Sequence, residues 1–153
     1  MYKEIVINNL DEMKSFAEEI GKSIFPGFLL CLEGDLGAGK TTFTKFFGAS
    51  IGITEVINSP TFTILKIYEG VNVLYHMDVY RLENIGYDYE LDDYIYGDGV
   101  SVIEWYQYIS SMLPKELLKI AINVNDSGER IVTINGEGRY EKIVKDISYR
   151  YSN

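Results

Sequence analysis

Two hydrophobic periods alternate along the chain, and each predicts a different kind of element. In some segments apolar residues recur every three or four positions, as they do on the buried face of a helix. In others a short apolar run lies between turn residues, which is typical of a strand buried in a sheet. Helices are therefore predicted at 10–24, 40–52 and 140–149, with a partly helical segment at 87–99. Strands are predicted at 4–7, 28–34, 61–70, 71–80, 100–105, 117–125 and 130–136.

Strands and helices are interleaved over the whole length, which favours an α/β fold with helices on the faces of a sheet. The 61–70 and 71–80 strands meet near Glu69-Gly70, so this pair is a predicted hairpin. No repeat, linker or change in composition divides the sequence. Residues 1–153 are therefore expected to form one domain.

Composition and charge narrow the classes of protein to which the chain can belong. The hydrophobic content of 46% is ordinary for a globular domain. No apolar run approaches the roughly 18 residues of a membrane span. The N-terminal segment does not read as a secretory signal, and Cys31 is the only cysteine, so a cytoplasmic protein is expected. The net charge of −9 opposes binding to phosphate backbones, so strong direct binding to nucleic acid is not expected.

The stretch EGDLGAGKTTF, residues 33–43, connects a predicted strand to a predicted helix. Gly34, Gly39, Lys40 and Thr41 match the pattern G-x-x-x-x-G-K-[ST] in full. Glycines let the backbone approach a phosphate chain, and the helix N-terminus adds amide donors. The lysine would reach the β- and γ-phosphates, and the threonine hydroxyl would bind Mg²⁺. The motif and its setting predict a nucleotide site in a P-loop NTPase-like, three-layer fold, in which helices flank a mostly parallel, mixed central sheet.

Two acidic residues are predicted at strand ends, where a P-loop protein completes its metal site. Glu104 follows the apolar run 100–103, and Asp78 ends another predicted strand. Such carboxylates can hold Mg²⁺ directly or through water, and one can orient the attacking water. The alternative is that each acid merely ends its strand in solvent, but the neighbouring P-loop favours function. His76, the single histidine, is predicted to have a structural hydrogen-bonding role.

Four motifs in a fixed order resemble the TsaE family of small bacterial P-loop ATPases. They are GDLGAGKTT at 34–42, SPTF at 59–62, HMDVYRL at 76–82 and VIEW at 102–105. The resemblance implies ATP or ADP with Mg²⁺, slow hydrolysis by the isolated protein, and assembly with the TsaD and TsaB proteins. It also implies that these partners transfer a threonylcarbamoyl group to adenosine 37 of tRNAs that read codons beginning with A.

The resemblance further implies roles for individual positions. Lys40, Asp78 and Glu104 are implied to act in catalysis, and Thr41 and Glu104 to bind the metal ion. SPTF is similar to the family's switch-like segment, in which Thr61 can approach the γ-phosphate. The positions implied to contact the nucleotide are Gly34, Asp35, Gly37, Ala38, Gly39, Lys40, Thr41, Thr42, Thr61, Trp105 and Arg130.

Two other classes of nucleotide-binding protein are weighed against this interpretation. A small-molecule or nucleoside kinase needs cationic groups for both the acceptor and the transferring phosphoryl group. The chain has four arginines and no arginine-rich lid segment. A GTP switch would carry a guanine-reading Asn-Lys-x-Asp segment, which is absent from the sequence. The sequence therefore favours ATP hydrolysis together with partner proteins, with the kinase as the alternative.

Overall fold

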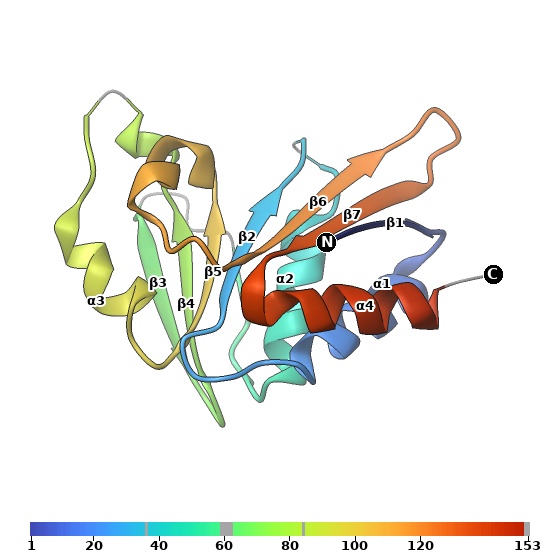
Figure 1. Cartoon of the computed structure of the whole chain (residues 1–153), viewed down its shortest axis with the longest axis horizontal. Helices are drawn as coiled ribbons and strands as arrows, with labels where there is room; N and C mark the ends of the chain where they lie inside the picture. Colours follow the sequence, from blue (N-terminus) through green and yellow to red (C-terminus); the bar gives the residue numbers. More distant parts are fainter. Residues whose placement is uncertain (36, 59–62, 84, 152–153) are drawn as a thin grey trace.

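The computed structural model describes residues 1–35, 37–58, 63–83 and 85–151 and has a seven-stranded sheet at its centre (Figure 1). Across the sheet the strands follow the order β1-β7-β6-β2-β5-β4-β3. The strands are β1 Tyr2–Ile7, β2 Leu29–Glu33, β3 Leu65–Glu69, β4 Val73–Asp78, β5 Val100–Glu104, β6 Leu118–Val124 and β7 Arg130–Gly136. The helices are α1 Leu10–Gly21, α2 Lys40–Ser50, α3 Asp92–Ile95 and α4 Glu141–Arg150. Short 3-10 turns are η1 Tyr80–Leu82, η2 Tyr89–Leu91, η3 Tyr106–Met112 and η4 Gly138–Tyr140.

The centre of the sheet is parallel and its two margins are antiparallel. Strands β6, β2, β5 and β4 run in one direction. Beyond β6, the strands β7 and β1 add antiparallel pairs, and β3 pairs antiparallel with β4 at the opposite margin. The predicted hairpin of β3 and β4 is confirmed, and so is the predicted α/β fold with a mixed sheet.

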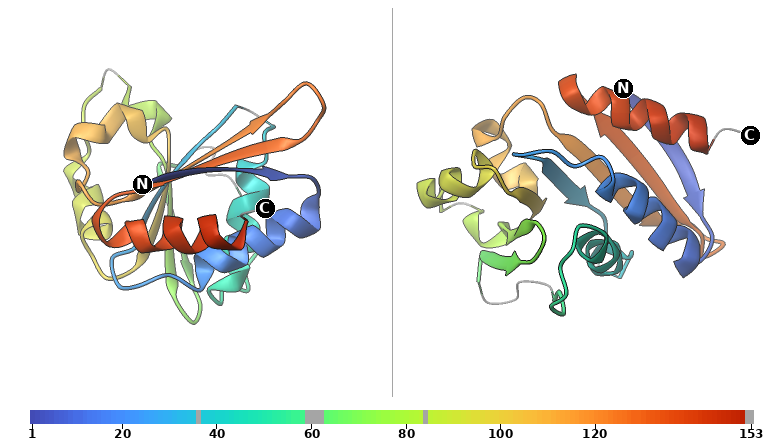
Figure 2. Two further views of the ribbon diagram at one scale, coloured as in Figure 1. Left: turned by 45° about the vertical axis from the view of Figure 1, so that its right-hand side comes forward. Right: turned by 90° about the horizontal axis from the view of Figure 1, so that it is seen from below.

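Helices and short turns cover both faces of the sheet, so successive side chains of a central strand enter two separate cores. Helices α1, α2 and α4 pack on one face, and α3 packs with short turns on the other (Figure 1). Helices α1 and α2 lie side by side (Figure 2), and the ring centroids of Phe16 and Phe43 are 5.8 Å apart. In β2, Leu30 joins the core under these helices, whereas Cys31 joins the core on the opposite face. The central strand is therefore buried on both sides, as its continuous apolar run predicts.

The structure differs from the prediction in two ways: several element boundaries shift by a few residues, and one short element was not predicted. Helix α1 ends at Gly21 and not at residue 24. Pro26 disfavours helical backbone at the residue before it, so the chain turns early, and Ile24 packs against the core from that turn. The second difference is η3, which lies where no element was predicted. It follows Trp105, whose left-handed backbone turns the chain at the end of β5.

The carboxyl ends of β2, β5 and β4 meet at one edge of the sheet (Figure 1). Open α/β sheets bind their ligands at this edge. The P-loop follows β2 here, while Asp78 and Glu104 are the last residues of β4 and β5. The topology therefore brings the P-loop and both predicted acids to the same place. None of the helices in the described part of the chain has the length and apolar character needed to cross a bilayer.

Candidate nucleotide site

The loop after β2 has a backbone shape that favours glycine at three positions. The angle φ is +150° at Gly34, +82° at Gly37 and +116° at Gly39, in the range that side chains disfavour. Gly34 has a second constraint, because a Cβ there would lie 2.2 Å from the carbonyl oxygen of Ile122 in β6. At Gly37 a Cβ would meet nothing within 4 Å. The loop is therefore packed tightly at its start and open at its middle.

Helix α2 begins at the end of this loop and directs its N-terminus at the site. Gly39 is the N-cap residue, and the Phe43 N–H donates to the Gly39 carbonyl at 2.9 Å. In an α-helix the N–H groups before this bond have no carbonyl partner within the helix. Together with the positive end of the helix dipole, they form a phosphate-binding arrangement. Thr41, the last residue of the motif, and Thr42 lie in this first turn.

Lys40, Glu104 and His76 form a chain of contacts beside the start of α2. The Lys40 Nζ atom lies 3.7 Å from Oε1 of Glu104. The His76 Nε2 atom lies 2.8 Å from Oε2 of the same carboxylate. His76 is fully buried, and Lys40 and Glu104 are largely buried. Each oxygen of the Glu104 carboxylate therefore has its own partner, and these partners come from two different elements.

Asp78 lies beside Glu104 because the parallel strands β4 and β5 pair these two residues in register. The Tyr80 N–H donates to Oδ1 of Asp78 at 3.0 Å. Burial is the main cause that raises the pKa of Asp78 above its usual range, and the negative charge of Glu104 raises it further. The Tyr80 hydrogen bond and the charge of Lys40 act in the opposite direction. Asp78 and Glu104 are thus neighbouring carboxylates whose negative charges a bound cation would stabilise.

Trp105 covers the amino group of Lys40. Its ring centroid lies 5.4 Å from Lys40 Nζ, and the rings of Tyr80 and Tyr108 lie 5.0 and 6.0 Å from it. The φ angle of Trp105 is +61°, which is unusual for a residue that carries a side chain. The residue is 39% exposed, so the aromatic group forms part of the rim of the site. Strained backbone of this kind clusters at functional sites.

Two cavities adjoin the P-loop. The first has a volume of about 290 Å³ and is lined by Leu32, Glu33, Gly34, Asp35, Lys40, Trp105, Gln107, Ala121 and Asn123. The second has a volume of about 190 Å³ and is lined by Ile7, Asn8, Asn9, Leu10, Met13, Gly39, Thr42 and Arg130. Arg130 is fixed there, since its Nε donates to the Ala38 carbonyl at 3.3 Å. The second cavity combines apolar walls with a few polar groups, which suits a nucleobase.

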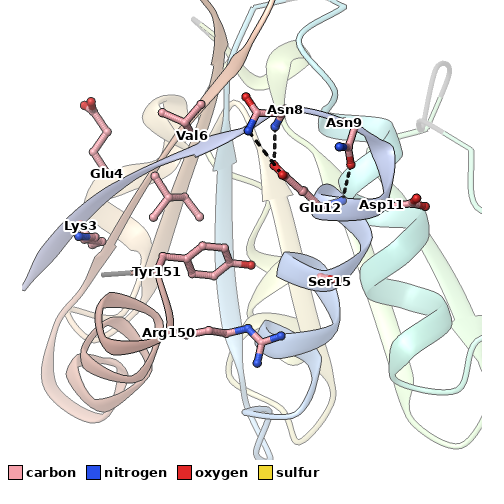
Figure 3. Close-up of a pocket in the computed structure, with 11 residues that line it drawn as sticks. Lys3, Glu4, Val6, Asn8, Asn9, Asp11, Glu12, Ser15, Arg150 and Tyr151 are labelled. Atoms are coloured by element: carbon pink, nitrogen blue, oxygen red, sulfur yellow. Dashed lines mark hydrogen bonds between the residues drawn. The ribbon is translucent and has the colours of Figure 1, made fainter. Parts of the chain in front are cut away.

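A wider hollow of about 870 Å³ lies between β1, the start of α1 and the end of α4 (Figure 3). Three of its polar residues, Asn8, Asn9 and Glu12, form hydrogen bonds at the start of α1. The Asn8 N–H donates to a carboxylate oxygen of Glu12 at 2.6 Å, and the Glu12 N–H donates to Asn9 Oδ1 at 2.9 Å (Figure 3). These bonds cap the helix. They also fix Asn8 and Asn9 where both side chains line the neighbouring 190 Å³ cavity.

The predicted metal ligands, Thr41 and Glu104, both lie at this edge of the sheet. Hydroxyl and carboxylate oxygens are ligands that Mg²⁺ accepts. Among the described residues, no group of three His, Cys, Asp or Glu side chains could hold a metal ion by itself. Mg²⁺ in nucleotide enzymes is usually held by one or two carboxylates together with substrate phosphates. The residues present therefore fit a magnesium–nucleotide complex.

Comparison with known proteins places this arrangement in a family. The sequence model described as "Threonylcarbamoyl adenosine biosynthesis protein TsaE" matches residues 7–132. The chain belongs to the TsaE family. The matched range of the TsaE model contains the P-loop, Asp78, Glu104 and Arg130.

Relatives in the TsaE family resemble the chain over most of its length. The Bacillus subtilis (strain 168) protein named "tRNA threonylcarbamoyladenosine biosynthesis protein TsaE" is 48% identical over 147 residues, covering 95% of this chain and 92% of that protein. A protein of the same name from Treponema pallidum (strain Nichols) is 42% identical over 117 residues, covering 75% and 87%. The crystal structure of Bacillus subtilis YdiB matches with a TM-score of 0.84 at 41% identity, covering 100% of this chain and 97% of that one. The predicted P-loop NTPase-like fold is thereby confirmed.

Sequence reasoning placed most of these residues but did not find every side chain of the site. Thr61 and the rest of SPTF lie outside the described residues. The contact between His76 and Glu104 was not predicted, although His76 stands two positions before Asp78 and so shares its face of the strand. Glu33 and Gln107 were also missed. Gln107 Nε2 donates to Glu33 at 3.0 Å across the first cavity, and neither residue belongs to a motif that sequence could single out.

Proposed function

We propose that this protein is a Mg²⁺-dependent ATPase that acts with TsaD and TsaB proteins. The reaction they serve is formation of the threonylcarbamoyl group on adenosine 37 of tRNAs that read codons beginning with A. The observation that carries the ATPase assignment is the juxtaposition of Lys40, Glu104 and Asp78 beside a complete P-loop. Relatives that match the chain over most of their length are named for tRNA threonylcarbamoyladenosine biosynthesis, which supports the pathway.

Each part of the nucleotide has a counterpart in the site. The amide groups at the start of α2 and the Lys40 ammonium hold the β- and γ-phosphates. The 190 Å³ cavity beside Arg130 takes the base. Thr41 and Glu104 would hold Mg²⁺, which would neutralise charge on the phosphates when bound. Asp78 receives the proton of the attacking water, and its raised pKa brings it closer to the value that suits a general base.

The partner proteins dock where the chain is acidic and rich in exposed tyrosine. Tyr80, Tyr89 and Tyr96 are 51%, 69% and 59% exposed. Residues 82–99 contain six acidic residues and no lysine or arginine. Tyrosine is enriched at protein interfaces, and this charge is complementary to a basic partner surface. The docking face comprises this segment and SPTF, and recognition of tRNA belongs to the partners because the net charge is −9.

Nucleotide binding measured by calorimetry tests the proposal. In the presence of Mg²⁺, ATP and ADP bind more tightly than GTP, and nucleosides alone do not bind. Lys40→Ala loses about 1.5–3 kcal/mol of ATP affinity because a charge-assisted contact disappears. Lys142→Ala, on the exposed side of α4, is the matched control and keeps the wild-type affinity. Equal ATP affinity in wild type and Lys40→Ala, or phosphorylation of a nucleoside, contradicts the proposal.

A further inference from the structure

Among the described residues, four polar or charged side chains are buried, and two of them have an atom without a hydrogen-bond partner. The four residues are Thr44, His76, Ser101 and Glu104. Thr44 bonds within α2, where its hydroxyl donates to the Lys40 carbonyl at 2.9 Å. Among the described residues, Nδ1 of His76 and Oγ of Ser101 have no hydrogen-bond partner. A buried polar atom without a partner is costly, so its retention calls for a physical reason.

We infer that His76 is a positioning residue whose Nε2–H fixes one oxygen of the Glu104 carboxylate. The inference rests on the proposed function only where it concerns nucleotide and Mg²⁺. It assigns to His76 no contact with a substrate. Its role is to hold Glu104 so that the other carboxylate oxygen stays available at the edge of the sheet.

The contacts of the imidazole ring determine which nitrogen carries the proton. Oε2 of Glu104 lies 2.8 Å from Nε2, and Lys40 faces the other oxygen of the carboxylate at 3.7 Å. A carboxylate can only accept hydrogen bonds. The proton shared with Glu104 therefore lies on Nε2. A proton on Nδ1 instead would leave a buried donor without an acceptor among the described residues.

Strand register explains how the ring reaches its target. His76 and Asp78 are two positions apart in β4 and so point to the same face. Glu104 of β5 is the register partner of Asp78, which places His76 on the diagonal beneath it. Lys40 and His76 thus hold the same carboxylate from a helix and from a strand.

The contacts of Lys40 and His76 with Glu104 differ in whether they can persist when a nucleotide binds. Lys40 is the P-loop lysine, and in the proposed function it turns toward phosphate. The bond from His76 can persist, because the ring is fully buried in the sheet. One oxygen of Glu104 then stays fixed while the other becomes available. Outer partners of this kind orient metal ligands, and their loss typically costs about 10- to 100-fold in metal affinity or activity.

Nitrogen NMR of histidine-labelled protein tests the assignment directly, because the chain has a single histidine. In the free protein we expect a protonated Nε2 whose proton exchanges slowly with water. Glu104→Ala should shift the Nε2 resonance. An unprotonated Nε2, or a resonance that Glu104→Ala leaves unchanged, would overturn the inference. This measurement needs no nucleotide and no partner, so its outcome is separate from that of the proposed function.

Two substitutions then separate the hydrogen bond from the packing of the ring. His76→Gln keeps an N–H donor for Glu104, whereas His76→Leu removes it. We expect the Mg²⁺ concentration needed for tight ADP binding to rise about 10- to 100-fold in His76→Leu and to return most of the way in His76→Gln. ADP affinity without Mg²⁺ should be the same in all three proteins.

Ser101→Ala is the matched control for disturbance of the sheet. Ser101 is buried in β5, and its oxygen has no hydrogen-bond partner in the described part of the chain, but its side chain faces the opposite core. This variant should keep the wild-type Mg²⁺ dependence. An unchanged Mg²⁺ dependence in His76→Leu, or an equal loss in His76→Gln and His76→Leu, contradicts the inference. If His76→Leu does not fold, the NMR experiment on the wild type and Glu104→Ala decides the question.

Discussion

The charged side chains at the carboxyl ends of the central strands contact one another, although they belong to different strands and helices. Glu104 of β5 contacts Lys40 of α2 and His76 of β4, and it raises the pKa of Asp78 beside it. Removing one partner of a buried charge leaves the other uncompensated, which is more costly than removing an exposed ion pair. Single substitutions here therefore report on the coupling between neighbours as well as on the residue that is changed.

Asp78→Asn should raise the stability of the free protein at pH 7 while lowering ATP hydrolysis. Burial raises the pKa of Asp78 in the folded state, so ionisation opposes folding. Protonated Asp78 makes its full contribution to the stability of the fold below its pKa in the unfolded chain, which is about 3.9. This contribution is lost as the pH rises through the pKa of Asp78 in the folded protein. Asparagine keeps an oxygen for the Tyr80 N–H. Thermal unfolding from pH 4 to pH 7.5 should therefore show a gain in Tm that shrinks as the pH falls.

The exposed residue Asp146 of α4 provides the comparison for this experiment. Asp146→Asn changes one carboxylate to an amide without touching the site. The pH-dependent gain in Tm should appear in Asp78→Asn and not in Asp146→Asn. A loss of stability in Asp78→Asn that is the same at every pH would show that the burial of its charge does not govern this position.

Trp105 fluorescence should change when ADP binds, and the origin of the signal is unambiguous because the chain has one tryptophan. In the structure the Lys40 ammonium lies over the indole ring. A phosphate chain in the P-loop would draw this cation away and alter the surroundings of the ring. The response should disappear in Lys40→Ala. Emission that stays constant at saturating ADP would place Trp105 apart from the nucleotide.

At the scale of elements, the join between β2 and α2 depends on the close approach of Gly34 to β6. Gly34→Ala places a Cβ against the Ile122 carbonyl and should cost about 1–3 kcal/mol, in addition to the penalty for a positive φ. Chemical denaturation measures this loss. Gly86→Ala is the control, since φ is +102° there but a Cβ would meet nothing within 4 Å. Equal losses in the two variants would mean that packing against β6 contributes nothing.

Sequence patterns predicted the elements whose signals are local. The apolar run of β2 and its neighbouring glycines predicted both the central strand and the loop that follows it. The pattern failed where a neighbouring residue redirects the backbone. Ile24 continued the helical spacing of α1, yet it packs from a turn because Pro26 follows. Residues 106–112 gave no helical signal, since their 3-10 turns depend on the left-handed Trp105.

The candidate site was predictable to the extent that its residues belong to motifs. Lys40 and Glu104 could be named from the P-loop and from an apolar strand. The pairing of Glu104 with His76 could not, because it requires the register of β4 and β5, which neither strand contains alone. Gln107 reaches Glu33 only through the turn after Trp105, so no spacing in the sequence could connect them.

At the scale of the whole molecule, the charge of −9 and the exposed tyrosines after Arg81 make the chain better suited to a protein partner than to RNA. A small P-loop protein commonly reaches its full rate only when a partner supplies a group or orders a switch segment. The site described above has groups that suit phosphate and Mg²⁺. Slow hydrolysis by the isolated chain is the expected consequence.

ATP turnover by this protein, measured alone and with TsaD and TsaB proteins from the same organism, tests the central claim most directly. The account predicts slow turnover alone and faster turnover when both partners are present. Glu104→Ala should remove turnover in both conditions while it leaves ADP binding in the absence of Mg²⁺ largely intact. Tight tRNA binding by the isolated protein at physiological salt would count against leaving RNA recognition to the partners. An ATPase rate that is indifferent to both partners would contradict the account.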